Sequence, residues 1–424
     1  MSGFVLYDDV TARQAEPFAL TRPFGELRAG ALLLRDRWAR ALGMHPTGFI
    51  GADHLSAFTE FGSPRARTRG RLPRGTVVVN ARFAPALASA GGTPVALQPG
   101  DSLRAAGAIV AVRLAEATPL SAFAHGATDL SSLARTGRRS IRGWWIGAAW
   151  DLVRLLPEML ADDLAVLAAE VPGEPPAHVT VLGEHRLAVE RGAHLEPFVV
   201  VDTTGGDVVV RAGARIAAFT RIAGPCIIGE GTIVAGGRFA CCAIGEHSRV
   251  CGEMSVATVA GHANKAHDGF VGHSIIGRWV NLGAGTTTSN LKNSYGSVRV
   301  ENRRGPHDTG LQFLGALVGD HAKTAIGTRL TTGTTIGAGA NVFGDRAPAR
   351  YVPPFAWGDR PPFERYELDK FLDVAAHVMG RRSVKLPSGL RRALAEAWRA
   401  SGGHQSRPAR RGSDAASRVP RRAR

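Results

Sequence analysis

The chain has 424 residues, which is long for one domain and fits two or three. Hydrophobic residues make up 44% of it and charged residues 21%, a balance that fits a globular protein with a substantial core. The net charge is +16, but seven arginines against one aspartate lie in residues 401–424. We therefore do not expect a nucleic-acid partner, because a basic enzyme for phosphorylated substrates explains the remaining excess equally well.

The four cysteines lie between 226 and 251 without CxxC spacing, which argues against a zinc site. No apolar run approaches the roughly 18 residues of a membrane helix. The first residues lack the basic and long apolar regions of a signal peptide. We therefore expect a cytoplasmic protein without membrane association.

Residues 1–175 are expected to form an α/β domain with a Rossmann-type parallel sheet. Apolar strand-like segments alternate with helical ones, with strands at 4–7, 76–80 and 108–112 and helices at 26–42 and 147–170. In such sheets ligands bind beyond the carboxyl ends of the strands, where Asp8, Asp9 and Asn80 would stand. The segment VPGEPP that follows is interpreted as a linker.

From about 180 to 350 an aliphatic residue recurs at every sixth position. A helix cannot keep a period of six on one face, whereas each side of a triangular β-solenoid coil takes six residues and turns one aliphatic side chain inward. A glycine often follows and fits the sharply turning corner. The pattern predicts a hexapeptide-repeat parallel β-helix, with runs at Val210, Ile216, Ile222, Ile228, Val234 and Ala240; Ile244, Val250 and Val256; Ile276, Leu282 and Thr288; and Val318, Thr324, Leu330, Ile336 and Val342.

The repeat loses its phase at about 257–275 and 289–315. We expect both segments to leave the solenoid as loops that line its binding face. From residue 360 to 401 the pattern is helical, with two amphipathic segments. Residues 402–424 are rich in Gly, Ser, Pro and Arg and are expected to be disordered.

Three strings follow one another in the second half: NKAHDGFVGHS at 264–274, WVNLGAGT at 279–286 and SNLKNSYG at 289–296. His267 lies four residues before Val271-Gly272, and Asn281 lies fourteen residues after His267. The spacing resembles that of the GlmU-type uridyltransferase/acetyltransferases. The strings resemble still more closely a divergent GlmU-like family with a short sugar-nucleotidyltransferase-type N-terminal domain, over nearly the whole chain to about residue 400.

The resemblance implies a left-handed β-helix that transfers acetyl from acetyl-CoA to an amino-sugar phosphate, with His267 as the base. A reference pKa of about 6.5 suits histidine to deprotonating an amine. Asn281 would bind the sugar, and the backbone amides of Gly283, Ala284 and Gly285 would hold CoA or a developing oxyanion. The further candidates for substrate binding are Lys265, Asn290, Lys292 and Arg238.

The chain departs from the better-known pattern at two positions, with Phe270 in place of a tyrosine and Ser255 in place of a phosphate-binding lysine. The exact acceptor therefore stays open. Each candidate also has a plainer interpretation, because a lone loop histidine is usually a surface residue, lysines are often solvated, and a turn asparagine often serves only the backbone. His262 and His273 are interpreted as structural.

The first half carries the string TRPFGELRAG at 21–30, which the divergent family shares, but lacks the Gly-rich loop of GlmU uridyltransferases. Arg22 and Arg28 could clamp nucleotide phosphates, together with Asn80, or they could be ordinary helix-start and surface residues. Asp8 and Asp9 are the candidate Mg²⁺ ligands, and both could instead be turn residues.

The sequence thus predicts a bifunctional enzyme. It would acetylate an amino-sugar 1-phosphate, with glucosamine 1-phosphate as the leading acceptor, and use UTP or another NTP with Mg²⁺ to make a nucleotide sugar, with UDP-N-acetylglucosamine as the leading product. The resemblance implies a homotrimer with sites between subunits. The alternatives are a single-function enzyme in which one half is inactive, and a non-catalytic scaffold or sugar-nucleotide sensor.

Overall fold

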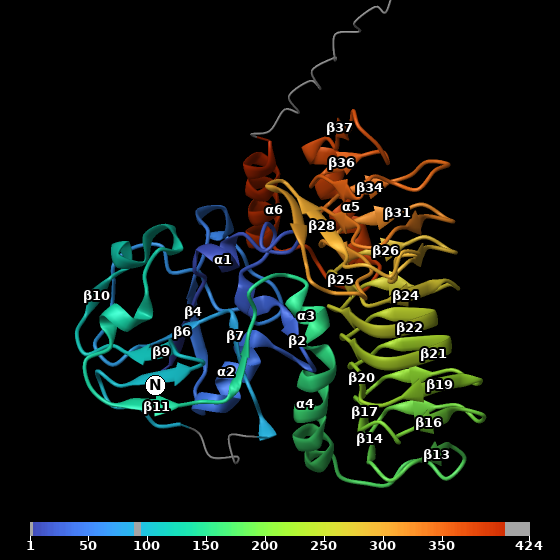
Figure 1. The fold of residues 1–424 in the computed structure, drawn as a ribbon, viewed down its shortest axis with the longest axis horizontal. Coiled ribbons are helices and arrows are strands. Elements are labelled where there is room, and N and C mark those ends of the chain that lie inside the picture. Colours follow the sequence, from blue (N-terminus) through green and yellow to red (C-terminus); the bar gives the residue numbers. More distant parts are fainter. Residues whose placement is uncertain (1–2, 89–94, 403–424) are drawn as a thin grey trace, which may run out of the picture.

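The computed structural model describes residues 3–88 and 95–402, which form an α/β domain beside a tall β-solenoid (Figure 1). The α/β domain is drawn in blue and cyan, and helix α4 stands between it and the solenoid. Apart from Gly402, the tail that we expect to be disordered lies outside the described residues. No helix of the described residues is long and apolar enough to cross a membrane.

The α/β domain is built on a six-stranded sheet in the order β11-β8-β9-β6-β1-β4. The strands are β1 Phe4–Tyr7, β4 Pro46–Ile50, β6 Val77–Asn80, β8 Ser102–Ala105, β9 Ala108–Arg113 and β11 Arg138–Ser140. Strand β1 lies parallel to β4 and β6, but β9 is antiparallel to β6 and β8. The predicted α/β domain is confirmed, but its sheet is mixed, because β9 runs against both of its neighbours. Ala106 and Gly107, both with positive φ, make a two-residue turn that forces β8 and β9 into a hairpin.

The helix expected at 26–42 is shorter than predicted. Residues Phe24–Glu26 form a 3-10 turn, Arg28–Ala29 (β2) pairs with Leu32–Leu33 (β3) in a small hairpin, and only Leu34–Leu42 (α2) is helical. Gly30 turns this hairpin with a φ of 63°, and a Cβ there would clash with Asp163 Oδ2 of α4. The close approach of α4 therefore requires a glycine at the turn of the hairpin.

The helix expected at 147–170 is divided into α3 Asp151–Arg154 and α4 Leu156–Glu170. Pro157 lies in the first turn of α4, where its missing amide hydrogen costs nothing. The apolar side of α4 packs on the solenoid through Leu156, Leu160, Leu164 and Leu167, against a stack made of Ala188, Val209, Ile227 and Ala243.

The period of six is confirmed as a left-handed β-helix whose coils have three faces. Face 1 contains β15 His194–Leu195, β18 Arg215–Ile216, β23 Asn264–Lys265, β26 Asn281–Leu282, β31 Lys323–Thr324, β34 Asn341–Val342 and β36 Ala356–Trp357. Face 2 contains β13 Thr180–Leu182, β16 Val200–Asp202, β19 Thr220–Ala223, β24 Phe270–Gly272, β27 Thr287–Thr288 and β32 Arg329–Leu330. Face 3 contains β14 Leu187–Val189, β17 Val208–Val210, β20 Cys226–Ile228, β25 Ile275–Ile276, β30 Leu317–Val318, β33 Thr335–Ile336 and β35 Tyr351–Val352. The long strands β21 Ile233–Ile244 and β22 Arg249–Val259 bend through all three faces.

Two corners of the solenoid differ in whether the α/β domain covers them. The docked corner joins face 3 to face 1, includes the turns at 245–248, 260–263, 277–280 and 319–322, and carries the α/β domain. The free corner joins face 1 to face 2 and includes the turns at 266–269 and 283–286. The two corners lie at the opposite ends of face 1.

The first break in the repeat, at 257–275, is not an expelled loop, so that prediction is wrong. Its residues stay in the coils and pair with the neighbouring turns through β22, β23, β24 and β25. Lys265 keeps the six-residue spacing between Val259 and Val271 but hides the repeat in the sequence, because a lysine takes the inward position opposite Val250. Its ammonium group is buried and donates hydrogen bonds to the backbone oxygens of Cys251 and His267, which replace the missing aliphatic packing.

The second break, at 289–315, does leave the solenoid as predicted. It carries an antiparallel hairpin of β28 Arg299–Asn302 and β29 Gly305–Asp308. The hairpin reaches back to the α/β domain, where Arg303 pairs with Glu16 at 2.5 Å. The two helices predicted near the C-terminus are present as α5 Leu368–Gly380 and α6 Ser388–Ser401, and α6 packs against the 3-10 turn Asp53–Leu55.

Candidate active site

His267 lies in the turn of the free corner, between β23 and β24, and its side chain is exposed. No described residue forms a hydrogen bond with its imidazole ring. The local backbone is held by Lys265, which donates to the carbonyl oxygen of His267. The histidine is thus presented to the outside by a rigid coil, with both ring nitrogens available.

Asn281 is placed on face 1 in the next coil. It stacks on Asn264, whose Nδ2 donates to Asn281 Oδ1 at 2.8 Å. Asn264 precedes His267 by only three residues, in the same coil. His267 and Asn281 therefore lie on neighbouring coils, one at the free corner and the other on face 1, without a direct contact between them.

The turn Gly283-Ala284-Gly285 does not offer the amide cradle that the sequence suggests. The amide of Gly283 donates to the carbonyl of Thr324 at 3.1 Å, and the amide of Gly285 donates to the carbonyl of Asp268 at 3.1 Å. These two hydrogen bonds join successive coils, so only Ala284 keeps an amide free of such a bond among the described residues.

The two lysines expected to meet a phosphate are also engaged by the fold. Lys265 is 2% exposed, and burial lowers the pKa of its ammonium group. Lys292 donates from Nζ to the backbone oxygen of Ser297 within the expelled loop. Neither ammonium group is positioned for a substrate in this conformation.

The remaining substrate-binding candidates, Asn290 and Arg238, lie on or next to face 2 of the solenoid. Asn290 pairs through Nδ2 with His273 Nδ1 at 2.9 Å, which gives His273 the structural role expected of it. Arg238 is exposed on face 2, next to Glu253 in the strand register and two coils below Phe270. It is accessible to a ligand on that face.

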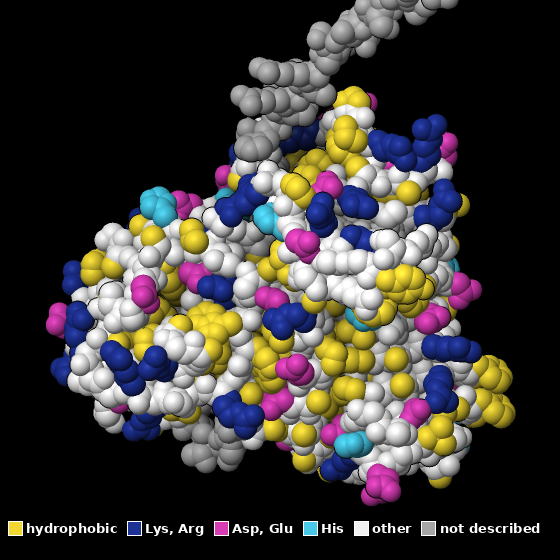
Figure 2. Space-filling view, viewed as in Figure 1, with side chains coloured by type: hydrophobic (Ala, Val, Ile, Leu, Met, Phe, Trp, Pro, Cys, Tyr) yellow, Lys and Arg dark blue, Asp and Glu magenta, His cyan; other side chains and the backbone are white. Residues whose placement is uncertain are grey.

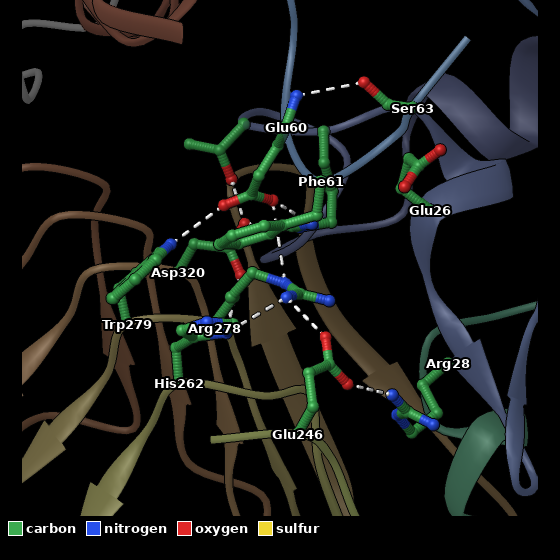
Figure 3. Close-up of polar contacts among 12 residues, drawn as sticks. Glu26, Arg28, Glu60, Phe61, Ser63, Glu246, His262, Arg278, Trp279 and Asp320 are labelled. Atoms are coloured by element: carbon green, nitrogen blue, oxygen red, sulfur yellow. Dashed lines mark hydrogen bonds and ion pairs between the residues drawn. The ribbon is translucent and has the colours of Figure 1, made fainter. Parts of the chain in front are cut away.

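Arg22 and Arg28 do not face a nucleotide cleft. They reach across to the docked corner, where solenoid carboxylates bind them (Figure 3). Arg22 Nε lies 2.6 Å from Asp320 Oδ2, and Arg28 Nη2 lies 2.6 Å from Glu246 Oε2. The prediction that Arg22 and Arg28 clamp a phosphate is therefore not supported, because both guanidinium groups already have carboxylate partners.

The same contacts form a buried ionic network between the two parts of the chain. Arg22 Nη1 pairs with Glu60 at 3.0 Å, and Arg278 of the solenoid pairs with Glu246 at 2.7 Å and approaches Glu60 at 3.6 Å. Trp279 Nε1 donates to Glu60 at 2.8 Å. Burial opposes the charge on Glu60, but Arg22 and Arg278 outweigh it and lower the pKa of Glu60 to about 2. The network fixes the α/β domain on the solenoid.

His262 is covered by this interface. It is 4% exposed, stacks on Phe61 at a centroid distance of 4.5 Å and packs at a tilt against Trp279 at 4.4 Å, and Phe61 and Trp279 also contact each other at 6.0 Å. Burial and the charge of Arg278 lower its pKa to about 3, so the ring stays neutral. Its interpretation as a structural histidine agrees with these contacts.

The strand ends of the α/β domain hold Asp8, Asp9 and Asn80. Asp9 caps helix α1 Val10–Arg13 and forms an ion pair with Arg82 at 2.6 Å, and Asn80 Nδ2 donates to Asp9 at 2.9 Å. Asp8 is 2% exposed and accepts the amide hydrogen of Phe24, while its Oδ1 atom is buried without a partner. Burial raises the pKa of Asp8 to about 7.

These carboxylates do not fit a Mg²⁺ ion. Such an ion needs exposed, ionised oxygens with room for water ligands. Asp9 is committed to an arginine and a helix cap, and Asp8 is enclosed. No cluster of three or more His, Cys, Asp or Glu residues among 3–88 and 95–402 is arranged to hold a metal. The prediction of Asp8 and Asp9 as a metal pair is not supported by their geometry.

A cavity of about 1050 Å³ opens instead between the α/β domain, the hairpin tip and α6. It continues into a second cavity of about 400 Å³ at the carboxyl end of β4, and the two share Arg13, Ala52, Asp53 and His125. Sequence reasoning missed the basic residues that line these cavities, namely Arg13, Arg67, Arg69, His125, Arg303 and Arg304. The arginine-rich break at 299–304 was the available signal.

The comparisons with known proteins bear on both halves of the chain. Residues 4–171 match the family model described as sugar nucleotidyl transferase. The bifunctional protein GlmU of Jannaschia sp. is 37% identical over 108 residues, which are 24% of this chain and 22% of the relative. GlmU of Synechococcus elongatus is 25% identical over 222 residues, which are 49% of this chain and 41% of the relative. The chain is GlmU-like.

A third relative of this GlmU-like chain is a bifunctional sugar-1-phosphate nucleotidylyltransferase/acetyltransferase of Sulfurisphaera tokodaii, 36% identical over 77 residues, or 18% of this chain and 19% of the relative. The chain spans less than half the length of the curated relatives it matches. Among solved structures, a hexapeptide transferase family protein from Anaplasma phagocytophilum has a TM-score of 0.26 at 16% identity, covering 54% of this chain and 100% of its own.

Proposed function

We propose that the chain is a two-site enzyme of nucleotide-sugar synthesis. The free corner would acetylate an amino-sugar 1-phosphate, with glucosamine 1-phosphate as the leading acceptor, and the α/β domain would transfer a nucleotidyl group to the sugar phosphate, with UDP-N-acetylglucosamine as the leading product. The observation that carries this proposal is the exposed imidazole of His267, which has no hydrogen-bond partner among the described residues and lies one coil from Asn281, on a solenoid fused to a sugar nucleotidyl transferase-type domain.

The acyl transfer needs only one proton acceptor from the protein. A sugar ammonium group binds near Asn281 and loses a proton to His267, and the free amine attacks the thioester carbonyl of acetyl-CoA. The carbon–nitrogen bond forms, the carbon–sulfur bond breaks, and the CoA sulfur leaves with a proton supplied by the histidinium ion, while the new amide nitrogen releases its second proton to water. A positioned general base contributes about 10²–10⁴-fold to such a rate.

The cavities of the α/β domain support nucleotide binding. They lie at the strand ends, where ligands of α/β sheets bind, and their arginines suit phosphate groups. The missing carboxylate pair for Mg²⁺ favours a second candidate, in which this domain binds a nucleotide sugar without making it and the chain is a single-function acyltransferase.

The surface at the free corner supports the homotrimer that the resemblance implies. Phe198 and Phe219 are 68% and 80% exposed and stack on each other at 5.4 Å, and Ile326 on the same edge is 79% exposed. Hydrophobic side chains project from the solenoid edge that faces away from the α/β domain (Figure 2). Such a row suits burial against a second copy.

Thiol release from acetyl-CoA in the presence of glucosamine 1-phosphate tests the acyltransferase. His267→Ala should lower the rate by at least 10²-fold. His194→Ala is the matched control, because His194 is an exposed histidine of face 1 in the first coils and should keep the full rate. Equal thiol release by both variants would remove His267 from the mechanism.

Pyrophosphate release from UTP and N-acetylglucosamine 1-phosphate, with Mg²⁺ added, separates the two candidates. Release that depends on the enzyme would support the bifunctional proposal. Thiol release without pyrophosphate release would support the single-function acyltransferase.

A further inference from the structure

A cavity of about 190 Å³ lies between face 1 of the solenoid and the C-terminal end of α5, a region that the proposed acetyl transfer does not use beyond Asn281. Two amide side chains, Asn264 and Asn281, form part of its wall. The rest of the wall is made of His262, Val280, Lys323, Val378, Arg381 and Arg382.

The charged groups of this cavity are all basic. Lys323 comes from β31, next above Asn281 in the strand register, and Arg381 and Arg382 follow α5 directly. Arg249, one position below Asn264 in the same register, lies close enough to act on Arg382. No Asp or Glu lines the cavity.

These cations have no carboxylate partners among the described residues, although the neighbouring docked corner pairs each of its arginines. Lys323 Nζ donates only to the carbonyl of His321 at 3.0 Å, and burial lowers its pKa to about 8. The Nε atom of Arg382 is buried without any hydrogen-bond partner. Four like charges in one place destabilise the fold unless an anion joins them.

The end of α5 accounts for only part of the cluster. A helix C-terminus attracts nearby cations, so Arg381 and Arg382 are stabilised there to some extent. Lys323 and Arg249 belong to the solenoid and gain nothing from being brought together with them. An unpaired cluster assembled from two separate elements, with a cavity and two amides between them, has the composition of an anion-binding site.

We propose that this cavity binds the phosphate group of a phosphate ester, held by Lys323, Arg381 and Arg382 with hydrogen bonds from Asn264 and Asn281. Phosphate binding is independent of the proposed acetyl transfer. Its role rests on that function, since the ester would be either the amino-sugar phosphate or the 3′-phosphate of CoA. The site would replace Lys265 and Lys292, which the fold engages elsewhere.

Isothermal titration of the whole chain with inorganic phosphate tests the site, and an unfolding midpoint is measured with and without phosphate. Wild-type protein should bind phosphate and gain a higher midpoint as phosphate is added. Lys323→Met and Arg382→Gln should each weaken binding about tenfold or more, because each removes a charge-assisted hydrogen bond. Arg329→Gln, at an exposed arginine of face 2 that does not line the cavity, is the control and should bind as wild type does.

The unfolding midpoint without phosphate guards against misfolded variants. If the cations repel one another, Lys323→Met and Arg382→Gln should match or exceed the wild-type midpoint. A lower midpoint together with no phosphate binding by wild type would overturn the proposal and leave the cluster as a helix-end contact.

Competition identifies the ester. Displacement of phosphate by glucosamine 1-phosphate supports the sugar, and displacement by CoA but not by dephospho-CoA supports the cosubstrate. Phosphate binding without thiol release would keep the site and reject the proposed function, whereas thiol release without phosphate binding would do the reverse.

Discussion

Two histidines five residues apart, His262 and His267, lie at opposite ends of one strand of face 1. His262 is in the docked corner, packed against Phe61 and Trp279, and its pKa of about 3 keeps it neutral. His267 is in the free corner, exposed and without a ring partner among the described residues. The same coil thus buries one imidazole as a packing element and leaves the other exposed, as the proposed base requires.

The comparison shows that cover by the α/β domain, and not the residue type, decides which of the two histidines is exposed to a substrate. The α/β domain covers the docked corner with a buried ionic network and an aromatic stack. The free corner has no such cover within the described chain and keeps its polar groups exposed. Variants that break one corner should therefore leave the other intact.

The largest expected effect is at the docked corner. Arg22→Met would leave Glu60 and Asp320 short of a partner, with side chains that are 4% and 2% exposed. Breaking a buried pair by removing one partner typically costs about 3–5 kcal/mol. Chemical denaturation should show this loss in the free energy of unfolding. A loss below about 1 kcal/mol would mean that the network does not hold the two parts together.

A smaller effect, dependent on pH, is expected at the strand ends of the α/β domain. Asp8 has a pKa of about 7 when folded, and an unfolded aspartate has about 3.9. Ionisation of Asp8 therefore lowers the free energy of unfolding. This loss is absent below pH 4, grows between pH 4 and 7, and reaches roughly 4 kcal/mol at most above pH 7. Asp8→Asn should remove this pH-dependent loss.

Unfolding curves measured from pH 4 to 8 check this expectation. As pH rises, the free energy of unfolding of Asp8→Asn should increase relative to that of the wild type. This result would show that Asp8 is an enclosed carboxyl group, as the buried groups of the docked corner are. Equal pH dependence of stability in both proteins would contradict this expectation. An increase in wild-type stability on adding Mg²⁺ that the variant lacks would also contradict it, and would restore Asp8 as a metal ligand.

The sequence predicted the solenoid because a period of six has one structural meaning, and it predicted α5 and α6 from their amphipathic pattern. It failed where a single side chain replaced the repeat, since Lys265 serves the backbone from an inward position. It also failed for Arg22 and Arg28. Their partners, Asp320 and Glu246, lie 298 and 218 residues away in the chain, and no local pattern reports such a pairing.

The family spacing selects His267 and Asn281 as candidates, and their roles stay predictions. The structure places them on neighbouring coils, at the free corner and on face 1, without a direct contact. The role expected of Gly283 and Gly285 failed, because a solenoid uses those amides to join its coils. Glycine-rich corners look alike in sequence whether they bind a ligand or the next coil.

The central claim is tested most directly by measuring acetyl transfer and unfolding together on His267→Ala and His262→Ala. The account predicts a crossed result. His267→Ala should lose at least 10²-fold in kcat/KM with an unchanged free energy of unfolding. His262→Ala should lose about 2–4 kcal/mol of stability, because it removes a buried ring that packs against Phe61 and Trp279, and keep most of its activity where it is folded. Loss of activity in His262→Ala while it is fully folded, or full activity in His267→Ala, would contradict the account.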